Sequence, residues 1–292
     1  MFKKYYVEHS KFSHPSNFCY LYDHFPESFD TIRKMLHGLF LHYADLDLLN
    51  VSVASEKYHE LNLRYVKNIL QCMMAHDPGK LTQARPPHDR VMGVCRDTAL
   101  LFCSILRSRH IPARIRSGFV TYFIPGLYLD GFCVEYYDEK SMRWKMIDTR
   151  TMPEHINHYQ LNIDFDVLDM PPSKFISATE AWRLCRFKKA DPVRFGSRQH
   201  RGLFTVRNRL IQDLALLNKN ETLIWDVWGM MQSSVVTDFD LLDELSNLLL
   251  NNIDDTETIT HFYNNHPMLK LTDPVLVDNP FLTAAWVTLA EH

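Results

Sequence analysis

Apolar residues recur at helical spacing in three segments of the first third of the chain. Between Ser28 and Tyr43 they fall every three or four positions, and Glu27-Ser28 before them is a typical helix start. A second run covers 66–74 and is closed by the His-Asp-Pro-Gly of residues 76–79. The third covers 96–109, with an apolar stripe and cations in its last turn. The pattern therefore predicts three amphipathic helices.

Residues 113–147 carry a different pattern, one that is typical of strands. Residues 113–123 predict one strand, which the Pro-Gly pair at 125–126 terminates. Residues 132–137 and 143–147 predict two more, on either side of an Asp-Glu-Lys-Ser turn that is a hairpin signature. A helix followed by consecutive antiparallel strands favours an α+β fold.

The second half of the chain is predicted to be mainly helical. Helices are expected at 177–186, 204–218 and 241–250. Neither an internal repeat nor a composition break typical of a linker is visible in the sequence. We therefore expect one main domain, divided as follows: residues 1–15 as an N-terminal tail, residues 16–235 as the domain with its core at 90–150, and residues 236–292 as a C-terminal helical extension.

Composition is that of a globular protein. Of the 292 residues, 46% are hydrophobic, which is enough for a sizeable core. The formal net charge of −3 leaves no basic excess. We therefore expect neither nucleic acid nor a membrane as a partner.

The spacing of the cysteines, and the lack of an apolar membrane span or signal peptide, indicate the cellular compartment. The longest strongly apolar run, 99–106, is too short to span a bilayer, and the N-terminal sequence lacks the apolar stretch of a signal peptide. The six cysteines are widely spaced, without a Cys-x-x-Cys pair. No cysteine or acidic pair near His155 and His158 completes a metal site. We therefore expect a cytoplasmic protein with free thiols, no cofactor and no bound metal.

Cys95 has a setting that the other cysteines lack. It follows Gly93 and Val94, and the predicted helix begins at or just after its thiol. Unpaired N–H groups and the positive end of a helix favour thiolate over thiol, and the same groups can bind an oxyanion. Cys103, two turns further along the apolar stripe, is expected to pack in the core.

The sequence on both sides of this helix carries a family pattern. Residues 93–97 read Gly-Val-Cys-Arg-Asp, and residues 110–114 read His-Ile-Pro-Ala-Arg. This layout resembles the transglutaminase-like superfamily, and blocks at 164–166, 180–186, 191–196 and 225–229 extend the resemblance to a bacterial subgroup. It implies an α+β, papain-like core in which the cysteine helix packs on an antiparallel sheet. It further implies that Cys95 is the nucleophile and Asp148 the carboxylate of a catalytic triad.

The histidine of that triad has no counterpart at its expected position. The subgroup carries Asp-His-Trp-Val-Cys-Glu-Tyr on the histidine strand, whereas residues 130–136 read Asp-Gly-Phe-Cys-Val-Glu-Tyr, so the position is Gly131. In a Cys-His-Asp triad the imidazole takes the thiol proton and later protonates the leaving group. Losing general acid–base help alone forfeits about 10²–10⁴-fold in rate.

Three alternatives follow from this departure. Another histidine replaces the missing one, the possible bases being His155, His158, His88 and His110. Alternatively, a substrate group or a bound partner supplies the base, or the fold is kept as a binding scaffold.

The resemblance thus implies one of two functions. The first is cysteine-dependent acyl transfer or amide hydrolysis on a protein or peptide substrate, impaired by Gly131. The second is an inactive pseudoenzyme that binds a protein or a small ligand. Cys95→Ala should abolish the first function and spare the second.

Overall fold

Helices and antiparallel sheets make up this α+β protein, as the computed structural model of residues 2–197 and 200–289 shows. Clustering of residue contacts divides the chain into two units. Unit 1 consists of Met1–Tyr5, Arg114–Phe132 and Met170–His292. Unit 2 consists of Tyr6–Ala113 and Cys133–Asp169.

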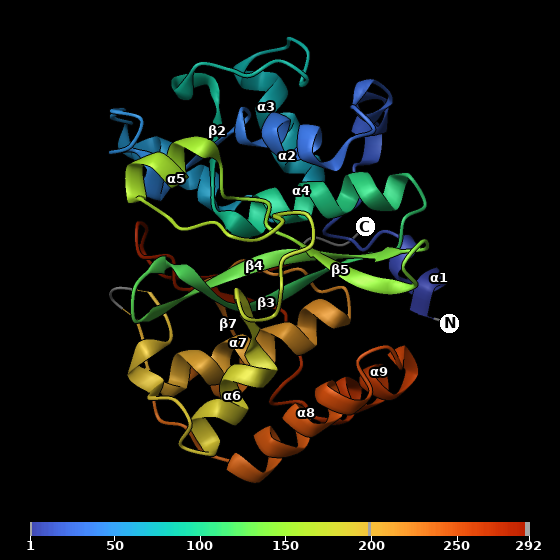
Figure 1. Cartoon of the computed structure of the whole chain (residues 1–292), viewed down its shortest axis with the longest axis vertical. Helices are drawn as coiled ribbons and strands as arrows, with labels where there is room; N and C mark the ends of the chain where they lie inside the picture. The colour runs from blue at the N-terminus through green and yellow to red at the C-terminus, as the bar shows by residue number, and fades with distance from the viewer. Residues whose placement is uncertain (1, 198–199, 290–292) are drawn as a thin grey trace. The chain divides into compact units, whose positions relative to one another are not determined.

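Unit 2 contains the cysteine helix and most of the N-terminal half of the chain. Its helices are α2 (Phe29–His37), α3 (Val66–His76), α4 (Cys95–Ser108) and α5 (Pro153–Tyr159), with 3-10 turns η1 (Ser16–His24), η2 (Tyr43–Asp45), η3 (Ser55–Asn62) and η4 (Pro87–Asp89). Its strands are β1 (Phe40–His42), β2 (Val91–Gly93), the second half of β4 (Leu127–Asp138) and β5 (Arg143–Ile147). Figure 1 shows α2, α3 and α4 gathered on one side of the β4–β5 hairpin.

The predicted hairpin and cysteine helix are confirmed. β4 and β5 pair antiparallel from Val134 opposite Ile147 to Asp138 opposite Arg143. α4 begins at Cys95, one residue before the predicted range, and its apolar residues are buried. The ring of Phe29 in α2 packs edge-on against Phe102 of α4 and against Tyr136 of β4. Edge-to-face aromatic contacts stabilise a fold by more than the burial of their surface area alone.

The helix predicted for 28–43 is wrong in its second half. α2 ends at His37, and Gly38 follows it as the C-cap. A Cβ added at Gly38 would lie 2.8 Å from the Cβ of Ala84, so only glycine fits the close approach of these two segments. The next residues form β1, which pairs in parallel with β2. Strand pairing far along the chain therefore overrides a local helical pattern here.

Unit 1 combines short strands with a cluster of helices. Its elements are β3 (Ala113–Ile124), the first half of β4, β6 (Phe175–Ser177), α6 (Ala178–Arg186), α7 (Leu203–Leu217), α8 (Phe239–Asn251), α9 (Thr256–Asn265), η5 (Pro192–Arg194), η6 (Gly229–Gln232), β7 (Asp226–Val227), β8 (Val275–Val277) and β9 (Ala285–Val287). β3 pairs antiparallel with β6, and β7, β8 and β9 form a second antiparallel sheet. The helices predicted at 177–186, 204–218 and 241–250 are confirmed as α6, α7 and α8.

A buried ion pair fixes β3 to α7 within unit 1. The guanidinium of Arg116 donates to both carboxylate oxygens of Asp213, with Nη2 2.7 Å from Oδ2, and the N–H of Ser117 donates to Oδ1 at 2.9 Å. Bidentate pairs of this kind combine charge with fixed geometry.

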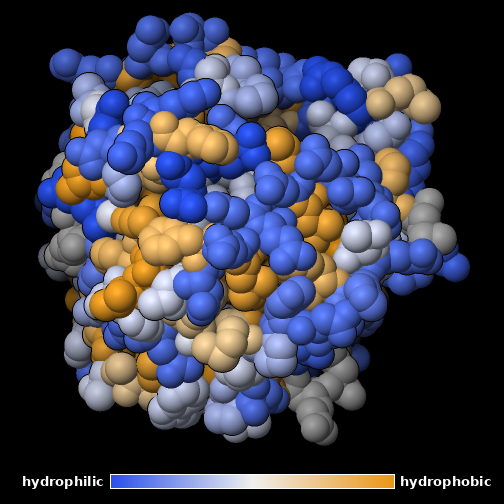
Figure 2. Space-filling view, turned by 90° about the horizontal axis from the view of Figure 1, so that it is seen from below, coloured by the Kyte–Doolittle hydropathy of each residue, from blue (hydrophilic) through white to orange (hydrophobic). Residues whose placement is uncertain are grey.

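The face of the molecule in Figure 2 carries hydrophobic residues in several separate patches between polar ones.

A short helix lies within the segment predicted as the N-terminal tail. α1 covers Phe2–Val7, and the side chains of Tyr6 and Phe12 are fully buried.

Within residues 2–197 and 200–289, the helices are too short or too polar to cross a membrane.

Candidate active site around Cys95

Cys95 is the first residue of α4, as the sequence predicts. Its thiol takes part in no disulfide bond and is half-buried. Val94 is the N-cap in extended conformation, so the chain turns into the helix at the cysteine itself. The first backbone N–H groups of a helix lack intrahelical acceptors and carry the positive end of its dipole. The thiol therefore lies where a thiolate and an oxyanion are both favoured.

The two residues after Cys95 anchor the start of the helix. The carboxylate of Asp97 accepts the N–H of Val94 at 2.8 Å, which is one half of a capping box. It also accepts Nη1 of Arg96 at 2.9 Å. Arg96 is fully buried and donates further to the backbone oxygens of Arg64, at 2.6 Å, and Leu63. In Gly-Val-Cys-Arg-Asp the last two residues thus hold the position of the third.

A small cavity lies beside Cys95 within unit 2. Its volume of about 20 Å³ gives room for one water molecule. Three segments of the chain supply its walls: β1 with the residues next to it, the start of α4, and the turn after β5. The residues that line it are His37, Phe40, His42, Asp45, Cys95, Thr98, Thr149 and Arg150.

Arg150 brings a fixed positive charge to this cavity. Its guanidinium pairs with both carboxylate oxygens of Asp45, at 2.8 and 3.0 Å. Burial alone lowers the pKa of Arg150, but Asp45 and, more weakly, Cys95 raise it above its ordinary value. Because this interaction is mutual, the guanidinium favours the thiolate form of Cys95.

Asp45 connects Arg150 to His155. Burial by itself raises the pKa of the Asp45 carboxyl, but the hydrogen bond from His155 and the Arg150 guanidinium hold it well below its usual range. His155 is fully buried; its Nδ1 accepts the N–H of Met152, and its Nε2 lies 3.1 Å from Oδ2 of Asp45. Both ring nitrogens of His155 are therefore engaged in holding α5 and Asp45 together.

Two further imidazoles line the cavity, and burial keeps both neutral. Burial and the nearby Arg150 place the pKa of His42 well below its ordinary value, against the opposing effect of Asp45. Its Nδ1 accepts the N–H of Ala44 at 3.1 Å, so the neutral ring carries its proton on Nε2. Burial likewise lowers the pKa of His37, although Glu154, 2.7 Å from its Nε2, opposes this shift.

Asp148 shapes the turn that presents Arg150. It directly follows β5 and is buried. Its Oδ1 accepts the backbone N–H groups of Arg150 at 2.8 Å and Thr151 at 3.1 Å. An aspartate that accepts N–H groups two and three residues later fixes a tight turn. Asp148 thus acts on the Cys95 site through the position of Arg150.

The four histidines named from the sequence lie away from the cavity lining. His155 is engaged as described above. His158 is exposed, with its ring edge-on to Tyr159. His88 is 76% exposed beside Asp89, and His110 is exposed just past the C-terminal end of α4, the end opposite Cys95. Gly131 lies in β4 and belongs to unit 1.

Sequence reasoning missed Asp45, His42 and Arg150. They come from two segments more than 100 positions apart in the chain, and no local motif marks them. A strand prediction for residues 40–42 would have pointed to His42. The helical spacing of apolar residues over 28–43 hid that strand.

The chain was also compared with known proteins. No family model, no curated protein and no solved structure matches it.

Proposed function

We propose that this protein is a transglutaminase-like, papain-like acyltransferase or hydrolase that forms a thioester on Cys95. The observation that carries the proposal is the position of a half-buried thiol at the start of α4, beside the guanidinium of Arg150. A helix N-terminus and an adjacent arginine both favour a thiolate. In this proposal Arg150 takes over the activating role that a histidine has in a triad.

The charge state of the cavity favours some acyl donors over others. Among the described lining residues, His37 and His42 are held neutral by burial, and Arg150 keeps its proton because its pKa is raised. None of the three is suited to protonating an amine as it leaves. A thioester or an activated ester does not require such an acid, because its leaving group departs as a stable anion. We therefore infer that acyl thioesters or activated esters, rather than amides, are the better substrates.

The proposed reaction has two balanced steps. The Cys95 thiolate attacks the acyl carbonyl, a new C–S bond forms, and the leaving thiolate or phenolate takes the electron pair of the bond that breaks. Backbone N–H groups at the start of α4 stabilise the oxyanion between these events. Water or an amine then attacks the acyl-enzyme, which releases the acid or amide and regenerates the Cys95 thiol.

Acylation of Cys95 by simple donors tests this function. The full chain is mixed with p-nitrophenyl acetate or S-phenyl thioacetate, and acetylation of each cysteine is followed by mass spectrometry. We expect Cys95 to be acetylated faster than Cys19, an exposed free thiol in the same chain. Acetylation of Cys95 no faster than of Cys19 would overturn the proposal.

Arg150→Gln and Arg150→Lys extend the test. The first removes the charge and should slow Cys95 acetylation at least tenfold, whereas the second keeps the charge and should retain part of the rate. Arg143→Gln is the matched control, since Arg143 is half-exposed on β5 and pairs with Asp169.

A binding module is the second candidate function, because the cavity beside Cys95 is too small for the peptide substrate that the family resemblance implies. A cavity of about 20 Å³ does not admit a peptide. In that case the protein would show no acyl-enzyme with any donor, and Cys95→Ala would leave ligand binding unchanged.

A further inference from the structure

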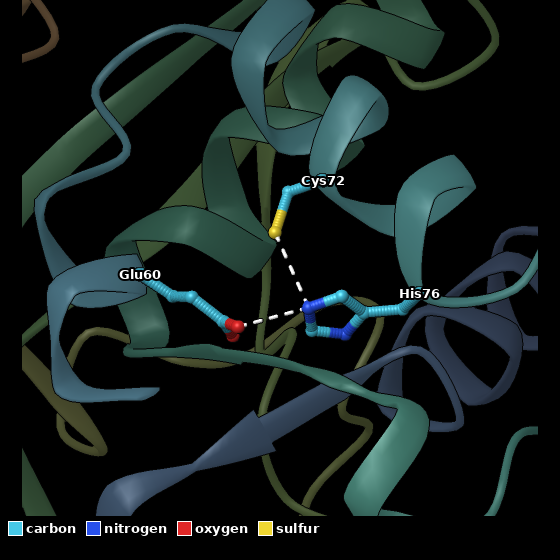
Figure 3. Close-up of side chains that lie close together, drawn as sticks. All are labelled: Glu60, Cys72 and His76. Atoms are coloured by element: carbon cyan, nitrogen blue, oxygen red, sulfur yellow. Dashed lines mark hydrogen bonds and ion pairs between the residues drawn. The ribbon is translucent and has the colours of Figure 1, made fainter. Parts of the chain in front are cut away.

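A second polar cluster lies in unit 2, built from residues of η3 and α3. Glu60 in η3 and Cys72 and His76 in α3 point toward one another (Figure 3). One ligand atom from each residue lies within 4.8 Å of the others, and all three residues are half-buried. We propose that these residues form a zinc-binding site.

The two distances from His76 to its neighbours fit a tetrahedral metal. Typical Zn–S, Zn–N and Zn–O lengths give tetrahedral edges of about 3.6 Å for S···N and about 3.3 Å for N···O. The observed distances are 3.6 Å from Cys72 Sγ to His76 Nε2 and 2.9 Å from that nitrogen to Glu60 Oε1. On the nitrogen–oxygen edge, a bound ion therefore requires the two atoms to separate by only a few tenths of an ångström.

The spacing of Cys72 and His76 explains part of this fit. Residues four apart on a helix lie on the same face, one turn above the other. Glu60 reaches the pair from η3, the 3-10 segment that precedes α3. The sequence gives no motif for this arrangement, since the third ligand comes from another element.

The outer contacts of the cluster orient two of the ligands. Nδ1 of His76 lies 3.3 Å from the backbone oxygen of Asp89, so an N–H there leaves Nε2 free to bind the metal. A zinc-binding histidine commonly donates its second N–H to a carbonyl in this way. Glu60 keeps Oε1 toward the cluster because its Oε2 accepts the N–H of Met92 at 2.6 Å.

The donor set favours zinc over magnesium or calcium. A thiolate and an imidazole are poor ligands for hard cations and good ones for zinc. Three protein ligands leave the fourth tetrahedral position to water, as in zinc sites that are open to an outside ligand.

One neighbouring cation opposes the metal. Nζ of Lys57 lies 3.3 Å from Oε1 of Glu60, the oxygen that faces the cluster. Removing this ammonium should tighten zinc binding, because the metal no longer competes with it for the carboxylate. An adventitious zinc ion elsewhere on the surface would not respond to this change.

Cobalt substitution is the direct test. The full chain is freed of metal with a chelator, dialysed and titrated with Co²⁺ while the near-ultraviolet and visible spectrum is recorded. We expect one Co²⁺ per chain, with a thiolate-to-cobalt charge-transfer band and the visible bands of tetrahedral cobalt, and we expect Zn²⁺ to displace it. The absence of a charge-transfer band would overturn the proposal.

Matched variants assign the ligands. Cys72→Ser, His76→Gln and Glu60→Gln should each weaken zinc binding at least tenfold in competition with a chromophoric chelator. Cys185→Ser, His59→Gln and Glu56→Gln are the controls; Cys185 is another buried thiol, and the other two are exposed neighbours in η3. Lys57→Met should bind zinc more tightly than the wild type. Equal losses in ligand and control variants would contradict the site.

A measurement on the unaltered chain covers the case in which a ligand variant fails to fold. Zinc should protect Cys72 from iodoacetamide under mildly denaturing conditions while leaving the alkylation of Cys19 unchanged, as read for each cysteine by mass spectrometry. Equal alkylation of Cys72 with and without zinc would overturn the proposal.

Discussion

Asp45 is the residue on which the polar part of the Cys95 site depends. It holds Arg150 through two hydrogen bonds and His155 through a third, and its side chain is 2% exposed. A buried charge pair of this kind adds little net stability, but removing one partner leaves the other charge uncompensated.

Asp45→Asn should therefore destabilise the protein by about 3–5 kcal/mol, the typical cost of breaking a buried pair. Urea unfolding followed by circular dichroism measures the change. Asp47→Asn, two positions away and exposed, is the control and should stay within about 0.5 kcal/mol of the wild type. An Asp45→Asn protein as stable as this control would show that Arg150 and His155 find other partners.

Thiol reactivity should separate Cys95 from Cys72 and Cys185. Burial raises the pKa of Cys185 to about 11, and burial together with Glu60 raises that of Cys72 to about 11. These two thiols remain protonated at pH 8. Cys95 is half-buried and lies next to Arg150.

In metal-free protein at pH 8, iodoacetamide should thus modify Cys95 at least tenfold faster than Cys72 or Cys185. The rates come from mass spectrometry of each cysteine peptide, with the unfolded chain as the reference in which all thiols react alike. If Cys95 reacts as slowly as Cys185, the argument for a favoured thiolate fails.

At the level of elements, the sequence predicts those helices that depend on residues close together in the chain. The apolar stripes of α3, α4, α6 and α7 arise from residues close together in the sequence, so their approximate ranges were predictable. The break of 28–43 was not, because it depends on Gly38 meeting Ala84 and on β1 pairing with β2. For the same reason the position of Cys95 was predictable, whereas its surroundings were not.

Gly38→Ala tests the close approach that ends α2. The new methyl group would lie 2.8 Å from the Ala84 Cβ and 3.0 Å from its Cα, and overpacking of this kind costs about 1–3 kcal/mol. We expect a loss of this size in the free energy of unfolding, although alanine favours helix more than glycine does. Gly79→Ala is the comparison, since the atoms near its added Cβ belong to the flexible side chain of Asp77. A stabilised Gly38→Ala protein would mean that helix propensity outweighs the contact.

At the scale of the whole molecule, the two units are each assembled from separate stretches of sequence. Unit 2 takes Tyr6–Ala113 and Cys133–Asp169, and the segment between them belongs to unit 1. The expected division at residues 15 and 235 follows the order of predicted elements along the chain, and that order does not say which distant segments meet. The α+β class was predictable because it depends only on the order of helices and strands.

The buried imidazoles of unit 2 give the chain a dependence on pH that can be worked out in sign. The pKa of His42 and that of His37 are both lowered in the folded state, mainly by burial. In the unfolded chain both rings take up protons near the ordinary value of about 6.5. Below that pH the unfolded state binds more protons than the folded state, so stability must fall as pH falls.

The fall from pH 7 to pH 5 should be measurable and should concentrate in unit 2. Each extra proton bound by the unfolded chain contributes a slope of about 1.4 kcal/mol per pH unit. Urea unfolding at several pH values gives the slope, which His42→Gln should reduce and the exposed His59→Gln should not. Hydrogen exchange, corrected for the intrinsic effect of pH, should show faster opening at pH 5 in α2 and β1 than in α7. Equal loss of protection in α7 would place the acid-sensitive groups outside the Cys95 site, whereas a loss confined to α2 and β1 would tie the stability of unit 2 to the neutral imidazoles beside its thiol.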